Sequence, residues 1–169
     1  DSVGFRERAK AGRPARPDAL DVVCLDLPFI SNFTDLDALA AEPAVRVRLT
    51  REAAEFGRPD AVLLPGSKNT AADLAWLRER GLDRAVLAHA AAGGVTVGVC
   101  GGFQMLGERL DDPLGLESAA GRVAGLGLLP VITEFGPDKV LVRREGLHAD
   151  WRLPVRGYEI HHGRTRLAP

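Results

Sequence analysis

The chain contains one cysteine whose neighbours suit covalent chemistry, Cys100 in the run Gly-Val-Cys-Gly-Gly of residues 98–102. A glycine-flanked cysteine after an apolar segment is typical of a nucleophile elbow, a strained strand-to-helix turn that raises the central side chain above the sheet. Glycines relieve the crowding of such a turn, and the positive end of the following helix would stabilise a thiolate. The pattern therefore favours Cys100 as a nucleophile, with a small buried cysteine in an ordinary turn as the alternative.

The second cysteine, Cys24, has no such surroundings, because it lies in the apolar run from Val22 to Leu25 with no glycine beside it. We expect Cys24 in the core. Positions 24 and 100 also lack the close pairing of cysteines that marks zinc sites and disulfide frameworks. The sequence accordingly predicts no metal site.

An acyl-transfer site also needs donors for the oxyanion that forms when a thiolate attacks a carbonyl group. The backbone amide of Gly101 is one candidate, because it directly follows Cys100. Gly66, in a Pro-Gly-Ser turn, is the second, since glycine lets an amide group point into a cleft. An ordinary strand-to-helix turn capped by Asn69 or Thr70 is the alternative for this segment.

The elements that must position these groups follow from the hydrophobic pattern. Strands and helices alternate with short connections, which predicts an α/β fold with an open, mostly parallel sheet and helices on both faces. Ligands of such folds bind beyond the carboxyl ends of the strands, where Gly66 and Cys100 lie. Expected strands are 22–30, 45–49, 61–64 and 95–99; expected helices are 35–41, 50–56, 71–80, 82–92 and about 102–109. Strands at 121–133, 139–143 and 155–161 are expected to extend the sheet.

Length and charge narrow the possible functions. The 169 residues suit one domain, expected over residues 20–169, after a linker-like segment 1–19 rich in Arg, Pro and Gly. The 22 basic and 23 acidic residues almost cancel, so nucleic acid and membrane are not expected partners. No stretch approaches the roughly 20 apolar residues of a membrane span, and no secretory signal begins the chain. A cytoplasmic location is therefore expected.

Longer motifs around these residues resemble one enzyme family. The run Gly-Val-Cys-Gly-Gly-Phe-Gln-Met-Leu-Gly at 98–107 is similar to the nucleophile motif of class I, triad-type glutamine amidotransferases. Segments 64–70, 125–129 and 157–163 resemble motifs of the cobyric acid synthase branch, in the same order and at similar spacing. The run Ser-Asn-Phe-Thr-Asp at 31–35 is closer to that branch than to its a,c-diamide synthase relatives.

The resemblance implies a flavodoxin-like fold with Cys100 as the nucleophile, Gly66 and Gly101 as oxyanion donors, and Gln104 beside the substrate. Bonding of Gln104 to nearby backbone is the alternative. The family reaction would hydrolyse L-glutamine through a cysteinyl thioester and pass ammonia to a synthetase domain of the same parent chain. That domain would amidate adenosylcobyrinic acid a,c-diamide to cobyric acid in cobalamin biosynthesis. ATP, Mg²⁺ and the corrinoid acceptor would bind there, because this chain has no phosphate-binding loop and needs no cofactor of its own.

The family pairs its cysteine with a histidine in a Tyr-x-His-Gly motif that is missing before Pro169. We therefore expect the catalytic histidine beyond this residue, in which case the isolated chain would be inactive. His161 is a site-lining residue or, less favoured, the base, and strand alternation sends it and His162 to opposite faces. His89 and His148 are expected to be surface residues.

Two alternatives to the corrinoid reaction stay open. The same glutaminase could serve another acceptor, such as a lipid-linked cell-wall precursor. A domain of this fold could also have lost its chemistry and act as a docking module, which the missing histidine motif would explain.

Overall fold

The computed structural model describes residues 18–169, so the linker predicted for residues 1–19 lies almost entirely outside the described part. A first sheet consists of four parallel strands in the order β2-β1-β3-β4. Their bounds are β1 (Leu20–Leu25), β2 (Val45–Thr50), β3 (Ala61–Leu64) and β4 (Val95–Gly98). The predicted strands are all present, although the first ends at Leu25 rather than at residue 30.

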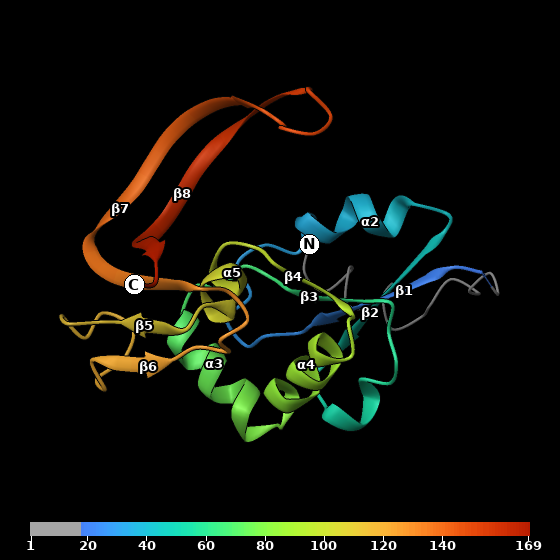
Figure 1. Ribbon diagram of the computed structural model, residues 1–169, viewed down its shortest axis with the longest axis horizontal. Helices are drawn as coiled ribbons and strands as arrows, with labels where there is room; N and C mark the ends of the chain where they lie inside the picture. The colour runs from blue at the N-terminus through green and yellow to red at the C-terminus, as the bar shows by residue number, and fades with distance from the viewer. Residues whose placement is uncertain (1–17) are drawn as a thin grey trace.

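Helices cover the two faces of this sheet unequally (Figure 1). The main core lies on one face, where Val23, Val62 and Leu64 pack beneath α3 (Thr70–Glu79), α4 (Leu82–Ala91) and α5 (Gly101–Leu106). On the other face, Cys24 and Leu63 pack against Leu36 of the short helix η1 (Thr34–Leu36), which continues into α2 (Asp37–Ala41). The predicted α/β fold is therefore confirmed.

Local signals explain where the helices begin and end. The side chain of Asn69 caps α3 by accepting a hydrogen bond from the amide of Ala72 at 3.0 Å. Gly81 adopts a left-handed conformation with φ of 66° between α3 and α4, which glycine allows without strain. The helix expected over 50–56 is reduced to one turn, η2 (Ala53–Glu55).

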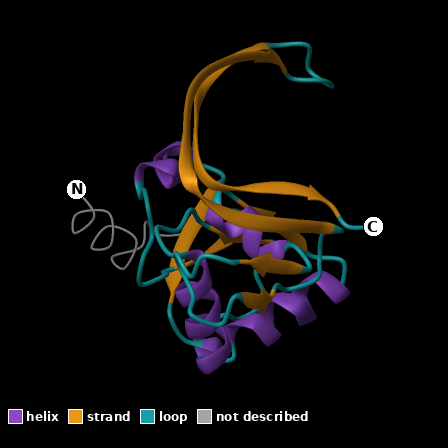
Figure 2. Cartoon of the chain, turned by 90° about the vertical axis from the view of Figure 1, so that its left-hand side faces the viewer, coloured by secondary structure: helices purple, strands orange, loops and turns teal. Residues whose placement is uncertain are grey.

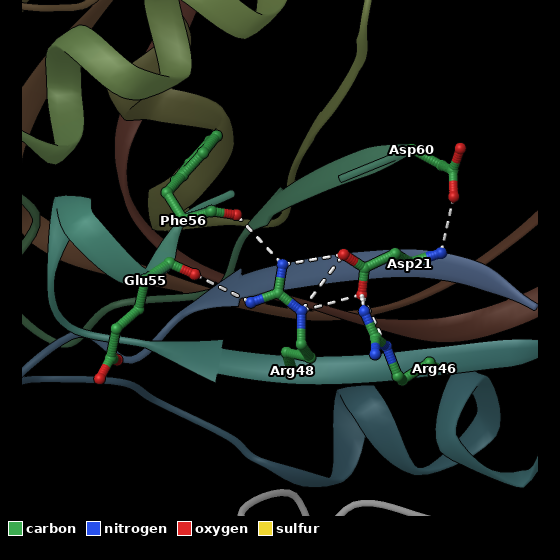
Figure 3. Close-up of polar contacts among 6 residues, drawn as sticks. All are labelled: Asp21, Arg46, Arg48, Glu55, Phe56 and Asp60. Atoms are coloured by element: carbon green, nitrogen blue, oxygen red, sulfur yellow. Dashed lines mark hydrogen bonds and ion pairs between the residues drawn. The ribbon is translucent and has the colours of Figure 1, made fainter. Parts of the chain in front are cut away.

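A polar network fastens that turn to the sheet (Figure 3). The Asp21 carboxylate accepts hydrogen bonds from the guanidinium groups of Arg46 and Arg48 on the neighbouring strand. Arg48 also donates to the carbonyl oxygens of Glu55 and Phe56 at 2.9 and 3.1 Å. These hydrogen bonds satisfy the carbonyl groups at the end of η2, which a longer helix would otherwise have paired.

The later strands form a second sheet, so the prediction that they extend the first sheet is wrong. Its order is β6-β5-β7-β8, with bounds β5 (Arg109–Asp111), β6 (Arg122–Ala124), β7 (Val131–Leu147) and β8 (Pro154–Leu167). The helix expected to reach residue 109 ends at Leu106, because Glu108 instead pairs with Val131 and Gly125. These partners are distant in sequence and leave no local pattern.

Strands β7 and β8 form a long antiparallel hairpin that rises from the body and curves over it (Figures 1 and 2). The register of the pair shifts between Glu134 and Lys139. At the tip, the rings of His148 and Trp151 stack with centroids 4.4 Å apart. Within residues 18–169 no helix has the length and apolar character needed to cross a bilayer.

Candidate active site

Cys100 stands at the turn between β4 and α5, as the sequence pattern predicted. Its backbone angles are φ 50° and ψ −110°, a conformation that side-chain-bearing residues rarely adopt and that is costly to hold. The turn is fixed by hydrogen bonds from the Val99 amide to the Leu64 carbonyl and from the Gly102 amide to the Val99 carbonyl. Strain of this kind, held by the surrounding fold, is a feature of nucleophile elbows.

The two cysteines differ as the sequence indicated. The Cys100 side chain is exposed, and its sulfur has the Ile160 carbonyl oxygen 3.9 Å away. Cys24 is fully buried, and burial raises the pKa of its thiol far above the ordinary value. Only Cys100 is therefore accessible to a ligand.

Close packing explains the glycines around Cys100. A Cβ atom at Gly98 would lie 2.7 Å from the backbone of Gly102. A Cβ at Gly101 would lie 2.9 Å from the Ser67 amide nitrogen, and one at Gly102 would collide with the Leu64 carbonyl oxygen. The turn thus has room for glycine alone at all three positions.

The Pro-Gly-Ser turn lies beside the cysteine. A Cβ built on Gly66 would be 3.6 Å from the Cβ of Cys100. The turn is held by pairing with the loop after β1, where the Ser31 amide donates to the Gly66 carbonyl at 2.8 Å. Within residues 18–169, neither the Gly66 nor the Gly101 amide donates a hydrogen bond to the protein, so both are free to bind a ligand oxygen.

Asp73, which the sequence did not single out, holds this turn in place through hydrogen bonds. Its carboxylate is buried and accepts hydrogen bonds from the Ser67 hydroxyl at 2.6 Å and the Phe29 amide at 3.1 Å. Burial raises the pKa of Asp73, while the hydrogen bonds from Ser67 and Phe29 oppose that rise. The one available signal was an acidic residue in the first turn of a helix, a position that many exposed acids also occupy.

Glu117 is a second supporting acid that the sequence did not reveal. It accepts hydrogen bonds from the amides of Thr70 at 2.7 Å and Ala71 at 3.2 Å, at the start of α3. Asp112 orders the loop that presents it, by accepting from the amides of Leu116, Glu117 and Ser118. Burial raises the pKa of Glu117. The loop has no periodic pattern from which this contact could have been predicted.

A cavity of about 660 Å³ opens beside Cys100. The body of the domain provides Cys100, Phe103 and Gln104 for its wall. The remaining lining residues come from the β7–β8 hairpin: Val140, Arg144, Tyr158, Glu159, Ile160, His161, Arg164 and Thr165. A ligand that reaches the cysteine therefore lies between the elbow with α5 and the hairpin.

Gln104 lines this cavity, but both ends of its amide are already engaged. Its Nε2 donates to the His162 carbonyl at 3.0 Å, and its Oε1 accepts from the Thr70 hydroxyl at 3.3 Å. The side chain is almost completely buried. Gln104 thus joins the start of α3 to the hairpin, and its partners are distant in sequence rather than nearby backbone.

His161 also lines the cavity, whereas the neighbouring His162 is exposed, as strand alternation predicted. Its Nδ1 lies 2.9 Å from the Gly163 carbonyl oxygen and its Nε2 lies 3.0 Å from a carboxylate oxygen of Glu159. The ring nitrogens thus contact the hairpin itself, and neither is hydrogen-bonded to the Cys100 sulfur.

The other two histidines lie away from the cavity. His89, on α4, contacts the Val95 carbonyl oxygen at 3.1 Å, and His148 lies at the hairpin tip. No histidine of residues 18–169 is hydrogen-bonded to the Cys100 sulfur. Nor does this part of the chain contain a cluster of three or more His, Cys, Asp or Glu side chains suited to a metal ion.

An α/β domain with an exposed cysteine at a strained strand-to-helix turn has the architecture of the glutamine amidotransferases. A solved glutamine amidotransferase matches it with a TM-score of 0.57 at 17% sequence identity. The match covers 83% of this chain and 70% of the other. A likeness at this level of identity supports the fold.

The family follows from the sequence comparisons. The chain belongs to the CobB/CobQ-like glutamine amidotransferase domain family, whose model matches residues 21–169. It is 50% identical over 168 residues to the cobyric acid synthase of Mycolicibacterium smegmatis, covering 98% of this chain and 32% of that protein. The cobyric acid synthase of Nitratidesulfovibrio vulgaris is 49% identical over 202 residues, 37% of its length. The chain thus spans about a third of the curated relatives that it matches.

Proposed function

We propose that this chain hydrolyses L-glutamine to glutamate and ammonia through a γ-glutamyl thioester on Cys100. One observation carries the proposal: the exposed Cys100 thiol stands on a strained turn beside the amides of Gly66 and Gly101, which have no hydrogen-bond partner within residues 18–169. A nucleophile next to two available donors suits acyl transfer, because attack on a carbonyl group creates an oxyanion there. The substrate is inferred from the family.

In the first step, the Cys100 thiolate attacks the side-chain amide carbon of glutamine, and the carbonyl oxygen becomes an oxyanion. The amides of Gly66 and Gly101 stabilise this oxyanion, and a donor in comparable sites contributes ~3 kcal/mol to the transition state. Collapse of the intermediate breaks the carbon–nitrogen bond. The leaving amide nitrogen receives a proton and departs as ammonia, and the acyl group stays on the sulfur as a thioester.

In the second step, water attacks the thioester carbon and releases glutamate, which returns the thiol. Departure of ammonia and attack of water need an acid and a base in turn, a role that one histidine fills in related chemistry. His161 is engaged by Glu159 and Gly163, so we assign it to support of the cavity. The base is expected to be the histidine of the family's Tyr-x-His-Gly motif.

The ammonia would be used by a synthetase domain of the same parent protein. The relatives named above are cobyric acid synthases about three times as long as this chain. We therefore propose that the acceptor is adenosylcobyrinic acid a,c-diamide, amidated at the expense of ATP and Mg²⁺ bound to the synthetase domain. A route between the two domains that is closed to solvent would keep the ammonia unprotonated and therefore nucleophilic.

Reaction with a glutamine-like diazo-ketone, 6-diazo-5-oxo-L-norleucine, tests the proposal. Peptide mapping should find the label on Cys100 and none on Cys24, and Cys100→Ser should abolish it while keeping the fold. Equal labelling of the two cysteines would refute the assignment. In the full-length protein, glutamine-dependent amidation of the corrinoid, and no amidation of a cell-wall precursor, would establish the acceptor.

A further inference from the structure

The polar run Ser-Asn-Phe-Thr-Asp at 31–35, which leads from β1 into η1, has no part in the reaction steps above. Most of its polar side chains bond to one another. The Asn32 side chain accepts from the Thr34 amide and hydroxyl at 3.2 and 2.8 Å and donates to the Asp35 carboxylate at 2.8 Å. These contacts shape the start of η1, so local structure explains these three residues.

Ser31 differs from them, because its hydroxyl group has no hydrogen-bond partner within residues 18–169. The residue is exposed and lies against the turn that carries Gly66. A Cβ atom built on Gly66 would collide with the Ser31 hydroxyl oxygen and would lie 3.6 Å from the Cβ of Cys100. The free hydroxyl and the nucleophile therefore border the same small space beside Gly66.

Backbone pairing holds Ser31 at this place. Its amide donates to the Gly66 carbonyl oxygen at 2.8 Å, and the Lys68 amide donates to the Phe29 carbonyl oxygen at 2.8 Å. The loop after β1 and the Pro-Gly-Ser turn thus form a short antiparallel bridge. Because the two segments are paired, a shift of either one would move the other.

The buried carboxylate of Asp73 fastens both sides of this bridge. It accepts from the Phe29 amide in the loop after β1 at 3.1 Å and from the Ser67 hydroxyl in the Pro-Gly-Ser turn at 2.6 Å. Ser67 in turn packs against the elbow, since a Cβ at Gly101 would lie 2.9 Å from the Ser67 amide nitrogen. The backbone of Ser31 is therefore held in a fixed position relative to the elbow, as a group that acts on the reacting atoms must be.

We propose that the Ser31 hydroxyl is a third donor to the oxyanion that forms when Cys100 attacks glutamine. It acts beside the amides of Gly66 and Gly101. A serine hydroxyl has one hydrogen to donate, and such side chains complete the oxyanion sites of other enzymes. The hydroxyl keeps its proton throughout, so the bonds that form and break are those given above. The inference rests on the proposed glutaminase function and adds a catalytic side chain to it.

Ammonia release from L-glutamine by the full-length protein tests this role. Ser31→Ala should lower kcat by about 10- to 100-fold, at or below the low end for loss of one oxyanion donor, because two others remain. KM should change less than about twofold, since the oxyanion is absent from the bound substrate. Ser31→Thr keeps a hydroxyl group on the same Cβ atom and should restore most of the rate. A kcat that falls less than about twofold in Ser31→Ala would overturn the inference.

Two measurements separate this role from a general effect on the fold. Iodoacetamide alkylates Cys100 by displacement of iodide and forms no oxyanion, so Ser31→Ala should change that rate, followed by peptide mapping, less than about twofold. Thr34→Val is the matched control, because it removes a hydroxyl bonded to Asn32 from the same exposed run. It should leave ammonia release almost unchanged. Equal losses of ammonia release in the two variants, or slower alkylation in Ser31→Ala, would show that the run only shapes the loop and would overturn the inference.

Cys100→Ser distinguishes failure of this inference from failure of the proposed function. If the unaltered full-length protein releases no ammonia from glutamine, or if Cys100→Ser releases it at the unaltered rate, the proposed function fails and the role of Ser31 fails with it. If Cys100→Ser abolishes release while Ser31→Ala retains it, hydrolysis at Cys100 stands and the hydroxyl donor alone is refuted. Slower release in Ser31→Ala, its return in Ser31→Thr and unchanged alkylation would together support the donor.

Discussion

Replacement of Gly101 by valine would show whether the elbow amides act on the reaction. A Cβ at this position would lie 2.9 Å from the Ser67 amide nitrogen and 3.0 Å from the Ser67 Cβ. These atoms belong to a turn held by backbone pairing, so it must shift by a few tenths of an ångström to admit the side chain. Oxyanion donors act over about 2.7–3.1 Å, and loss of one costs ~3 kcal/mol. We therefore expect glutamine hydrolysis to slow roughly 100-fold.

The assay is ammonia release from L-glutamine by the full-length protein, with circular dichroism and thermal unfolding as measures of the fold. Gly136→Val is the matched control, because a Cβ at Gly136 meets nothing within 4 Å and this glycine has no positive φ. It should retain nearly full activity. A folded Gly101→Val protein with unimpaired ammonia release would show that the amide of residue 101 and its neighbour do not stabilise the oxyanion.

Three further outcomes are expected. Cys24 should react with iodoacetamide only after unfolding, since burial raises its pKa, and mass spectrometry of native and urea-treated protein would check this. Asp21→Asn should lower the free energy of unfolding by about 2 kcal/mol in urea titrations at pH 7. Hydrogen bonding by Arg48 lowers the pKa of Asp21, so its contribution exists above the unfolded value of about 3.9 and is lost as the pH falls through the folded pKa. Gln104→Ala should cost about 1 kcal/mol and speed hydrogen exchange in β8, with unchanged exchange arguing against the cross-link.

The first sheet could be predicted because its strands are buried and continuous in apolar character. Residues 61–64 and 95–98 are short apolar runs between helical segments, and each became a parallel strand. The positions of glycines were as informative about the turn at Cys100 as the apolar runs were about the strands. The three glycines beside Cys100 predicted a crowded turn, and the structure has backbone atoms within about 3 Å of each position where a Cβ would be built.

The second sheet could not be predicted in the same way, because its pairings join residues that are far apart in sequence. Nothing in the pattern of residues 107–111 distinguishes the end of a helix from the start of β5, which pairs with Ile132 and Val123 across long loops. The alternation of residues within a strand likewise does not indicate which sheet the strand will join. Exposure adds to the difficulty, since most side chains of the hairpin are not buried.

The same distinction separates the parts of the candidate site. Cys100 and Gly66 belong to turns whose shape is set by adjacent residues, so their types and spacing indicated a nucleophile and a donor. The charged wall of the cavity is made by Arg144 and Arg164, which come from two strands and approach the cysteine only when the hairpin folds over the elbow. The body of the domain thus provides the elbow, which local patterns indicated, and the hairpin provides the facing wall of the cavity, which no local pattern indicates.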